Sequence, residues 1–237
     1  MAKAAEKLIS PKATDFRVCA RTPLSELSPE GTAESSPGLE SWVSKRQRAA
    51  QSADDPYLRP SFSFSNRMRR LAWSMCWTLL FRPSPRPFHA WRAFLLRCFG
   101  ARLGPHCHFY PRSRIWAPWN LLCADGVSLG DEAEIYNPSP VTMESHAIVS
   151  QQAYICGATH DYNDPSFPLI SFPMKLGAYS WVCARASVSP GVNLGDGAVL
   201  GLGSVATRDL KPWTVYAGVP AQPVKQRVGR EPSTPAT

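Results

Sequence analysis

The residue with the clearest chemical potential is the histidine of the segment ICGATHDY, residues 155–162. An imidazole that is neutral at physiological pH can take the proton from a hydroxyl group while the oxygen attacks an ester or thioester. Asp161 follows His160 directly, and two interpretations of its carboxylate are open. It orients or charge-stabilises the imidazole, or it caps a loop. The pair therefore predicts a general base, His160, with Asp161 as a second candidate catalytic residue.

The other four histidines fit structural positions better. His106 and His108 flank Cys107 in a faintly metal-like His-Cys-His, but they lie in weakly patterned sequence, so a structural role is favoured. His146 is expected on the surface, and His89 on the surface or at the cap of a helix. No metal site is expected.

The cysteines and the absence of several motifs argue against several classes of protein. The seven cysteines are odd in number and contain no Cys-x-x-Cys pair, which argues against a disulfide framework or a zinc ribbon. The N-terminus lacks the continuous apolar segment of a secretory signal. No P-loop, Gly-x-Ser-x-Gly elbow or dinucleotide fingerprint is present, since no strand-to-helix unit surrounds Gly201-Leu202-Gly203. We expect a cytoplasmic protein with reduced thiols.

A period of six residues organises the sequence around His160. From residue 176, six hexads follow in one frame without a gap: LGAYSW, VCARAS, VSPGVN, LGDGAV, LGLGSV and ATRDLK. Fifth positions are mostly small, and first positions are aliphatic: Leu176, Val182, Val188, Leu194, Leu200 and Ala206. Three blocks of 18 residues precede them in the same frame, at 103–120, 123–140 and 143–160, and every break falls at the same phase. The longest break, residues 161–175, follows His160.

An aliphatic residue buried once in six fits a short strand and a corner, and three such sides close a triangular coil. Coils then stack through parallel strands about 4.8 Å apart. The pattern predicts an all-β dominated fold, a parallel β-helix of about five triangular coils over residues 103–211, with an insertion loop at 161–175. Insertions at one phase leave along one edge of the prism, so His160 is predicted where a coil meets an excluded loop.

The flanking regions are predicted to differ in kind. Residues 1–57 show no hydrophobic periodicity and are predicted to form a disordered leader. Residues 212–237 are predicted to form a C-terminal tail. Residues 58–102 are expected to form a basic, apolar helical cap over the first coil. Its first helix should span 65–81, with Ser65 and Asn66 as caps.

A second helix is predicted at 88–99, ended by Gly100. Trp91 and Leu95 lie on its apolar stripe together with Phe88, Phe94 and Cys98. Arg92 and Arg97 are expected to project elsewhere.

The net charge of +8 originates in the middle of the chain, since residues 56–124 hold eleven Arg and no Asp or Glu. Such a stretch is attracted to an anionic membrane or to phosphate, although Arg that only faces water is the other reading. The most apolar window, residues 71–81, is about half of the roughly 20 residues that cross a bilayer. Interleaved Trp and Leu favour an interfacial surface or subunit packing over nucleic acid. We therefore expect no nucleic acid partner, and either a free protein or one held peripherally at the inner membrane surface.

Five segments resemble the hexapeptide-repeat acyltransferases, and among them the colanic-acid-biosynthesis-type O-acetyltransferases: FRPSP (81–85), WRAFLLRCFGARLG (91–104), PWNL (118–121), VSQQAYICGATHDY (149–162) and AGVPAQPVK (217–225). The resemblance runs from about residue 61 to residue 227. It implies a left-handed β-helix, a homotrimer, acetyl-CoA as co-substrate and a catalytic histidine at His160. The zinc-dependent carbonic-anhydrase-like branch of this fold is not indicated, because its closely spaced pair of histidines is missing.

The same resemblance implies a donor site. In the galactoside-type acetyltransferases, coenzyme A lies along the outer edge between subunits. The matching positions here are Trp181, Ala184, Gly201, Leu202, Gly203, Thr207, Arg208 and Lys225. Glycine permits close backbone approach, and Arg208 and Lys225 would meet anionic phosphates. Leu202 stands where the family usually has a small Ala, and plain corner geometry is the alternative reading for the two glycines.

Together with His160, the resemblance implies an acetyl-CoA-dependent O-acetyltransferase that acts on a sugar hydroxyl in exopolysaccharide or lipid-linked glycan biosynthesis, by direct transfer without an acyl-enzyme. Asn137, one coil before His160, is a candidate to position the acceptor, with a turn asparagine as its alternative. Two other functions stay open. One is an inactive β-helix scaffold or binding protein, and the other is an acetyltransferase for serine, an antibiotic or a free sugar.

Overall fold

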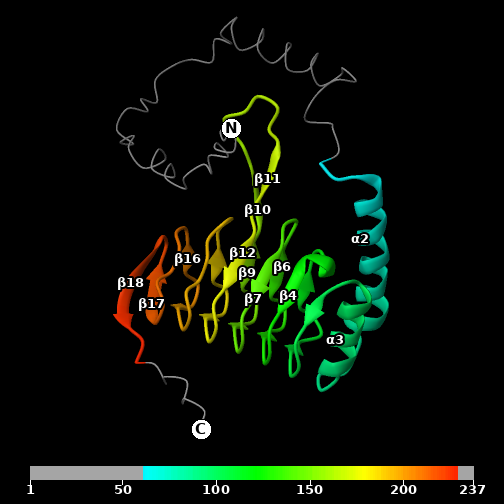
Figure 1. Ribbon diagram of the computed structural model, residues 1–237, viewed down its shortest axis with the longest axis horizontal. Helices are drawn as coiled ribbons and strands as arrows, with labels where there is room; N and C mark the ends of the chain where they lie inside the picture. Colours follow the sequence, from blue (N-terminus) through cyan, green and yellow to red (C-terminus); the bar gives the residue numbers. More distant parts are fainter. Residues whose placement is uncertain (1–60, 229–237) are drawn as a thin grey trace, which may run out of the picture. The chain divides into compact units, whose positions relative to one another are not determined.

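The computed structural model describes residues 61–228, so the predicted leader, residues 1–57, lies outside the described residues. Two helical segments precede a prism of stacked coils (Figure 1). Helix α2 (Phe64–Cys76) runs into the π-helix η3 (Trp77–Phe81), and α3 (His89–Cys98) follows. A 3-10 turn, η4, spans Pro118–Asn120. The two helices predicted from the sequence are confirmed.

Three sheets form the faces of the prism. Sheet A contains β1 (Arg102–Leu103), β4 (Leu121–Cys123), β7 (Val141–Met143) and β12 (Met174–Leu176). Sheet B contains β2 (His108–Phe109), β5 (Ser128–Leu129), β8 (Ile148–Val149), β13 (Trp181–Val182), β15 (Val199–Leu200), β17 (Thr214–Gly218) and β18 (Ala221–Gln226). Sheet C contains β3 (Arg114–Ile115), β6 (Glu134–Tyr136), β9 (Tyr154–Cys156), β14 (Ser187–Val188) and β16 (Val205–Ala206). The chain visits A, B and C in turn and then rises one coil, which gives the left-handed β-helix that was predicted.

The predicted interior is confirmed residue by residue. The first positions of the six hexads, from Leu176 to Ala206, are all at most 2% exposed. They stack across coils, because Val182 pairs with Val149 on one side and with Leu200 on the other. The fifth positions are buried as well, including Ser180 and Ala198. Burial of these two sets of side chains fixes the corners and aligns the strands of successive coils.

The helices cover the first coil through a few buried contacts. The Nε1–H of Trp73 donates to the carbonyl of Ile115 at 2.7 Å, and that of Trp77 donates to the carbonyl of Ser113 at 2.9 Å. Phe81 and Leu96 are fully buried beside them. The predicted helical cap is therefore present, although its N-cap is Ser63, whose hydroxyl accepts the Asn66 N–H at 3.2 Å.

The predicted orientation of the second helix is wrong for Arg92 and for most of the apolar stripe, although Leu95 is buried and Arg97 is exposed as expected. Trp91 and Phe94 face outward, with 38% and 54% of their surface exposed, while Arg92 is fully buried. The Arg92 guanidinium donates to the carbonyls of Phe109, Pro85 and Arg86 and to the hydroxyl of Ser84. These acceptors belong to the turn before the helix and to β2. Only a long side chain with several donors satisfies them together, which draws Arg92 inward.

The insertion after His160 is a hairpin rather than an irregular loop. Strand β10 (Ala158–His160) pairs antiparallel with β11 (Leu169–Ser171), and the hairpin stands out from the prism (Figure 1). The hairpin returns the chain to sheet A at β12. Beyond residue 211, β17 continues sheet B in parallel with β15, and β18 folds back on β17.

Candidate active site

His160 ends β10 and is held by the far side of its own hairpin. Its Nδ1 lies 2.9 Å from the carbonyl oxygen of Phe167, and the two rings stack 4.4 Å apart at 7°. A carbonyl oxygen can only accept, so Nδ1 carries the hydrogen of the neutral ring. The Nε2 lone pair is then left for an incoming proton, which is the tautomer that a general base needs.

Asp161 contacts its own loop rather than the imidazole. Its Oδ1 accepts the backbone N–H of Asn163 at 3.0 Å, and its own N–H donates to the carbonyl of Pro168. These contacts fit the loop-cap reading of Asp161. In this hairpin the Phe167 carbonyl orients the imidazole.

Several predicted donor residues lie at the corner between sheets B and C. Trp181 is 42% exposed on β13, and Leu202 is 75% exposed at the next corner up. Gly203 donates its N–H to the carbonyl of Ala184 at 3.1 Å, has a φ of +64°, and has open space where a Cβ would be. At Gly201 a Cβ would lie 3.1 Å from the Tyr216 carbonyl oxygen, so close backbone packing accounts for that glycine.

The remaining predicted residues lie elsewhere. Thr207 and Arg208 follow β16 at the corner between sheets C and A, the same edge from which the His160 hairpin leaves two coils earlier. Two coils correspond to about 10 Å along the axis. Lys225 lies on β18, paired with Val215. Sheet C thus separates the His160 edge from the corner of Gly203 within one protomer.

Asn137 has a structural role. Its side chain is fully buried, with Oδ1 accepting the N–H of Ala117 and Nδ2 donating to the carbonyl of Ala117, both at 2.9 Å. The amide that was expected to position an acceptor hydroxyl is occupied by the neighbouring coil. These contacts fit the alternative interpretation of Asn137, a structural asparagine in a turn.

A ladder of polar side chains that the sequence did not reveal climbs the edge between sheets B and C. Arg112 Nη1 and Glu132 Oε1 lie 2.7 Å apart. Gln152 Nε2 then donates to Glu132 Oε2 at 2.8 Å, and Arg185 Nε donates to Gln152 Oε1 at 2.7 Å. Glu132, Gln152 and Arg185 share the left-handed φ that Gly203 has one coil further on. The repeated corner position was the only signal for this ladder in the sequence, and three different residue types occupy its four places.

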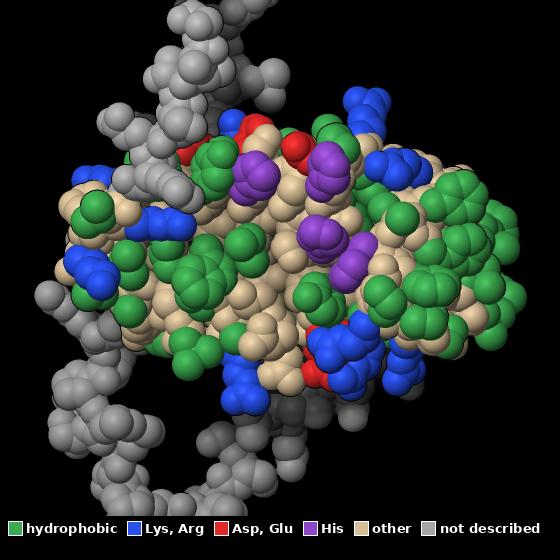
Figure 2. Space-filling model, turned by 90° about the horizontal axis from the view of Figure 1, so that it is seen from below, with side chains coloured by type: hydrophobic (Ala, Val, Ile, Leu, Met, Phe, Trp, Pro, Cys, Tyr) green, Lys and Arg blue, Asp and Glu red, His purple; other side chains and the backbone are tan. Residues whose placement is uncertain are grey.

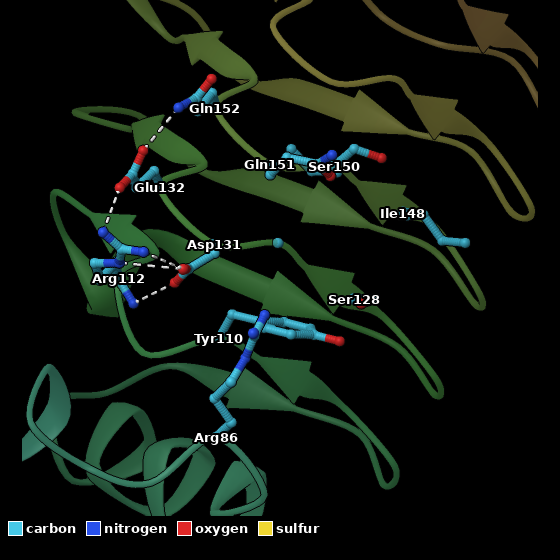
Figure 3. A pocket seen from close by; sticks show the side chains of 12 residues that line it. Arg86, Tyr110, Arg112, Ser128, Asp131, Glu132, Ile148, Ser150, Gln151 and Gln152 are labelled. Atoms are coloured by element: carbon cyan, nitrogen blue, oxygen red, sulfur yellow. Dashed lines mark hydrogen bonds and ion pairs between the residues drawn. The ribbon is translucent and has the colours of Figure 1, made fainter.

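A groove of about 660 Å³ lies beside this ladder on sheet B (Figure 3). Ser128, Ser150 and Gln151 are among the residues that line it. At its helical end the Arg86 guanidinium lies 5.5 Å from the centre of the Tyr110 ring. At its other end Trp181 Nε1 donates to Ser150 Oγ at 2.8 Å. One predicted donor residue, Trp181, therefore contacts the wall of the groove.

Within residues 61–228, no group of three or more His, Cys, Asp and Glu side chains could hold a metal ion. The His-Cys-His segment divides: His106 lies 3.0 Å from an oxygen of Asp125, and the Cys107 thiol faces backbone carbonyls. His108 instead packs edge-on against His89, with ring centres 4.9 Å apart.

No family model matches the chain. It is 33% identical over 170 residues to the "Putative colanic acid biosynthesis acetyltransferase WcaF" of Escherichia coli (strain K12), which covers 72% of this chain and 93% of that protein. The fold resembles a galactoside acetyltransferase in complex with coenzyme A, with a TM-score of 0.64 and 22% identity over 70% of this chain and 84% of that one.

It also resembles the hexapeptide-repeat containing acetyltransferase VCA0836 of Vibrio cholerae, with a TM-score of 0.63 and 20% identity over 69% of this chain and 93% of that one. The stacked hexads, the hairpin after the third coil and the extent of the WcaF match all indicate the same family. The chain belongs to the hexapeptide-repeat acetyltransferases, in the family of WcaF, and is an acetyltransferase.

Proposed function

We propose that this acetyltransferase uses acetyl-CoA to modify a sugar hydroxyl during exopolysaccharide or lipid-linked glycan biosynthesis. WcaF of Escherichia coli bears the name "Putative colanic acid biosynthesis acetyltransferase", and the galactoside acetyltransferase structure holds coenzyme A. The observation that carries the proposal is the hydrogen bond from His160 Nδ1 to the Phe167 carbonyl, since it leaves Nε2 as the proton acceptor.

The transfer proceeds in one ternary complex. His160 Nε2 takes the hydroxyl proton while the sugar oxygen attacks the thioester carbonyl carbon. The C–O bond forms, the C–S bond breaks, and the imidazolium returns the proton to the departing coenzyme A thiolate. No acyl-enzyme is needed, and the Cys156 thiol is engaged with the Ala158 carbonyl at 3.2 Å.

The active protein is a homotrimer with sites between protomers. His160 and the corner of Gly203 lie on opposite sides of sheet C, so one protomer does not bring them together. The hairpin of one protomer would therefore reach the donor corner of the next. There Trp181, Ala184, Leu202 and the glycines contact the pantetheine arm. Exposed Arg208 and half-buried Thr207, which lie on the same edge as the His160 hairpin of the first protomer, meet the phosphates together with exposed Lys225.

The acceptor sugar lies in the groove on sheet B, in place of the site expected at Asn137. Ser128, Ser150 and Gln151 offer hydroxyl and amide groups to sugar hydroxyls, and the groove ends beside Trp181. A polar groove of about 660 Å³ has room for a short glycan. A free sugar is a second acceptor of the same chemistry, and serine or an antibiotic offers a hydroxyl as well.

Purified protein tests the proposal directly. Acetyl-CoA should raise the melting temperature, and thiol release should depend on a glycan acceptor and yield an alkali-labile acetyl ester. Thermal stabilisation by acetyl-CoA with no transfer to any hydroxyl acceptor would favour the inactive scaffold. If acetyl-CoA neither stabilises the protein nor donates an acetyl group, the assignment of acetyl-CoA as the donor is refuted.

A further inference from the structure

The outer surface of the first helix is unusually apolar. Phe64, Met68, Leu71 and Met75 recur at helical spacing along α2, and they expose 70%, 46%, 53% and 57% of their surface. Trp73, on the opposite side of the helix, is the residue of α2 that is buried against the prism. The helix therefore turns its larger apolar face away from the protein.

The apolar surface continues onto the next two segments. Leu79 and Leu80 of η3 are exposed, and Trp91 Nε1 donates to the Leu80 carbonyl at 3.2 Å, which joins η3 to α3. Trp91 stacks on Phe94 with ring centres 5.8 Å apart. We define the outer apolar patch as Phe64, Met68, Leu71, Met75, Leu79, Leu80, Trp91 and Phe94. Figure 2 shows hydrophobic side chains gathered at this helical end of the molecule.

Arginines without acidic partners accompany the patch. Arg67, Arg82 and Arg97 are exposed on α2, after η3 and on α3, and none of them has an ion pair among the described residues. Arg67 and Arg82 lie 5.9 and 5.6 Å from the ring centres of Phe64 and Trp77, and Arg97 Nη2 donates to the carbonyls of Leu103 and Gly104 at 3.2 and 3.1 Å. Neither kind of contact supplies a negative charge, so these three exposed guanidinium groups can still attract an external anion. Arg69 and Arg70 lie closer to indole rings, 4.2 Å from the ring centre of Trp119 and 4.5 Å from that of Trp116.

We propose that the outer apolar patch and these three arginines dock the protein on an anionic lipid bilayer. A helix of this kind lies in the plane of the interface with its apolar face among the acyl chains and its basic residues at the headgroups. None of the helices in residues 61–228 has the length and apolarity that crossing a bilayer requires. Such docking would hold the proposed site near lipid-linked acceptors.

A second copy of the chain is the competing occupant. Patch packed against patch would bring Arg67, Arg82 and Arg97 of the two copies together, and like charges at an interface are unfavourable. The proposed trimer uses the edges along the prism, whereas the patch lies on the helices at one end of it (Figure 1). Charge thus favours the bilayer over self-association.

The test is cosedimentation of the full chain with vesicles that contain phosphatidylglycerol, compared with vesicles of phosphatidylcholine alone. We expect binding to the anionic vesicles that weakens between 0.1 and 1 M salt, as the Debye length falls from about 10 Å to about 3 Å. Changing Arg67, Arg82 and Arg97 to Gln should weaken binding on the order of 100-fold at 0.1 M salt, about fivefold for each arginine. Changing Leu71 and Met75 to Ser should also weaken it on the order of 100-fold.

Matched controls separate the patch from general changes of charge or polarity. Arg112→Gln with Arg185→Gln removes charges that already have partners in the corner ladder, and Val228→Ser alters a 99% exposed residue at the other end of the chain. Both controls should bind as the wild type does. Sedimentation velocity and the melting temperature are measured for every variant to detect any change of assembly or fold.

Three results would overturn the proposal. The wild type could ignore anionic vesicles at low salt, the patch variants could bind as well as the controls, or the Leu71/Met75 variant could lose its oligomeric state. The last result would identify the patch as a contact between copies. Because the readout is vesicle binding, failure here is distinct from failure of the acetyl transfer proposal.

Discussion

Replacing Arg92 by Met tests how the helical cap is held to the first coil. Its fully buried guanidinium donates to the Phe109 carbonyl at 2.6 Å and to Ser84, Pro85 and Arg86 at 2.7, 2.9 and 2.5 Å. Met keeps much of the aliphatic volume and removes all four bonds. The change therefore isolates the hydrogen bonds from the packing.

The size of the effect follows from where each acceptor lies. The Phe109 carbonyl lies in the interior, but in the variant it still has a hydrogen bond with His89 Nδ1 at 2.9 Å. Water can reach the three acceptors of the turn. Each lost bond then costs about 0.5–1.5 kcal/mol. Burial lowers the pKa of Arg92, and removing the buried charge recovers part of that cost. We expect a net loss of about 2–3 kcal/mol in the free energy of unfolding.

Urea unfolding measures this loss. All variants are compared at one protein concentration, because association contributes to the stability of an oligomer. At a slope of about 2–3 kcal/mol per molar urea, the midpoint should fall by about 1 M with the slope unchanged. Arg97→Met is the matched control, since Arg97 is exposed on the same helix and water can replace its bonds to the carbonyls of Leu103 and Gly104. It should cost less than about 1 kcal/mol. Equal midpoints for wild type and Arg92→Met would refute the role given to these bonds.

Four further predictions follow from the structure. Asp161→Ala should lower kcat less than about tenfold, because its carboxylate bonds Asn163 rather than His160; a loss as large as that of His160→Ala would contradict this. Mixing His160→Ala and Trp181→Ala protomers should restore about one quarter of wild-type activity if each site takes one residue from each neighbour, and no recovery would place each site within one protomer. Ser128→Ala with Gln151→Ala should raise the acceptor KM severalfold and leave the acetyl-CoA KM unchanged, whereas an unchanged acceptor KM would move the acceptor out of the groove. Deleting residues 1–57 should preserve cooperative unfolding and transfer, and loss of either would show that the segment completes the core.

The repeat was predictable because it depends on one physical requirement, burial at a fixed period. Leu176, Val182 and Val188 could be placed in the interior from spacing alone, and their stacked register follows from it. The corner ladder was not predictable, because its four residues, Arg112, Glu132, Gln152 and Arg185, share a position but alternate among a cation, an anion and an amide. The hydrogen bonds and ion pair of the ladder form only between successive coils, so they depend on how the coils stack.

The helices show where hydrophobicity misleads. The prediction assumed that the stripe with Trp91 and Phe94 turns inward, but carbonyls of residues 85, 86 and 109 select Arg92 instead. Those acceptors come from a turn and a strand whose geometry no helical pattern contains. The partner of His160 was hidden for a similar reason, since the Phe167 carbonyl reaches Nδ1 only after β10 and β11 pair.

The most direct test of the central claim is the kinetics of His160→Ala. If Nε2 is the proton acceptor, kcat should fall about 10²- to 10⁴-fold while the Kd for acetyl-CoA stays within a few-fold of wild type. The variant should keep its oligomeric state and melting temperature, because the hairpin strands pair through their backbones. Wild-type turnover by the purified, correctly assembled variant would remove His160 from the mechanism.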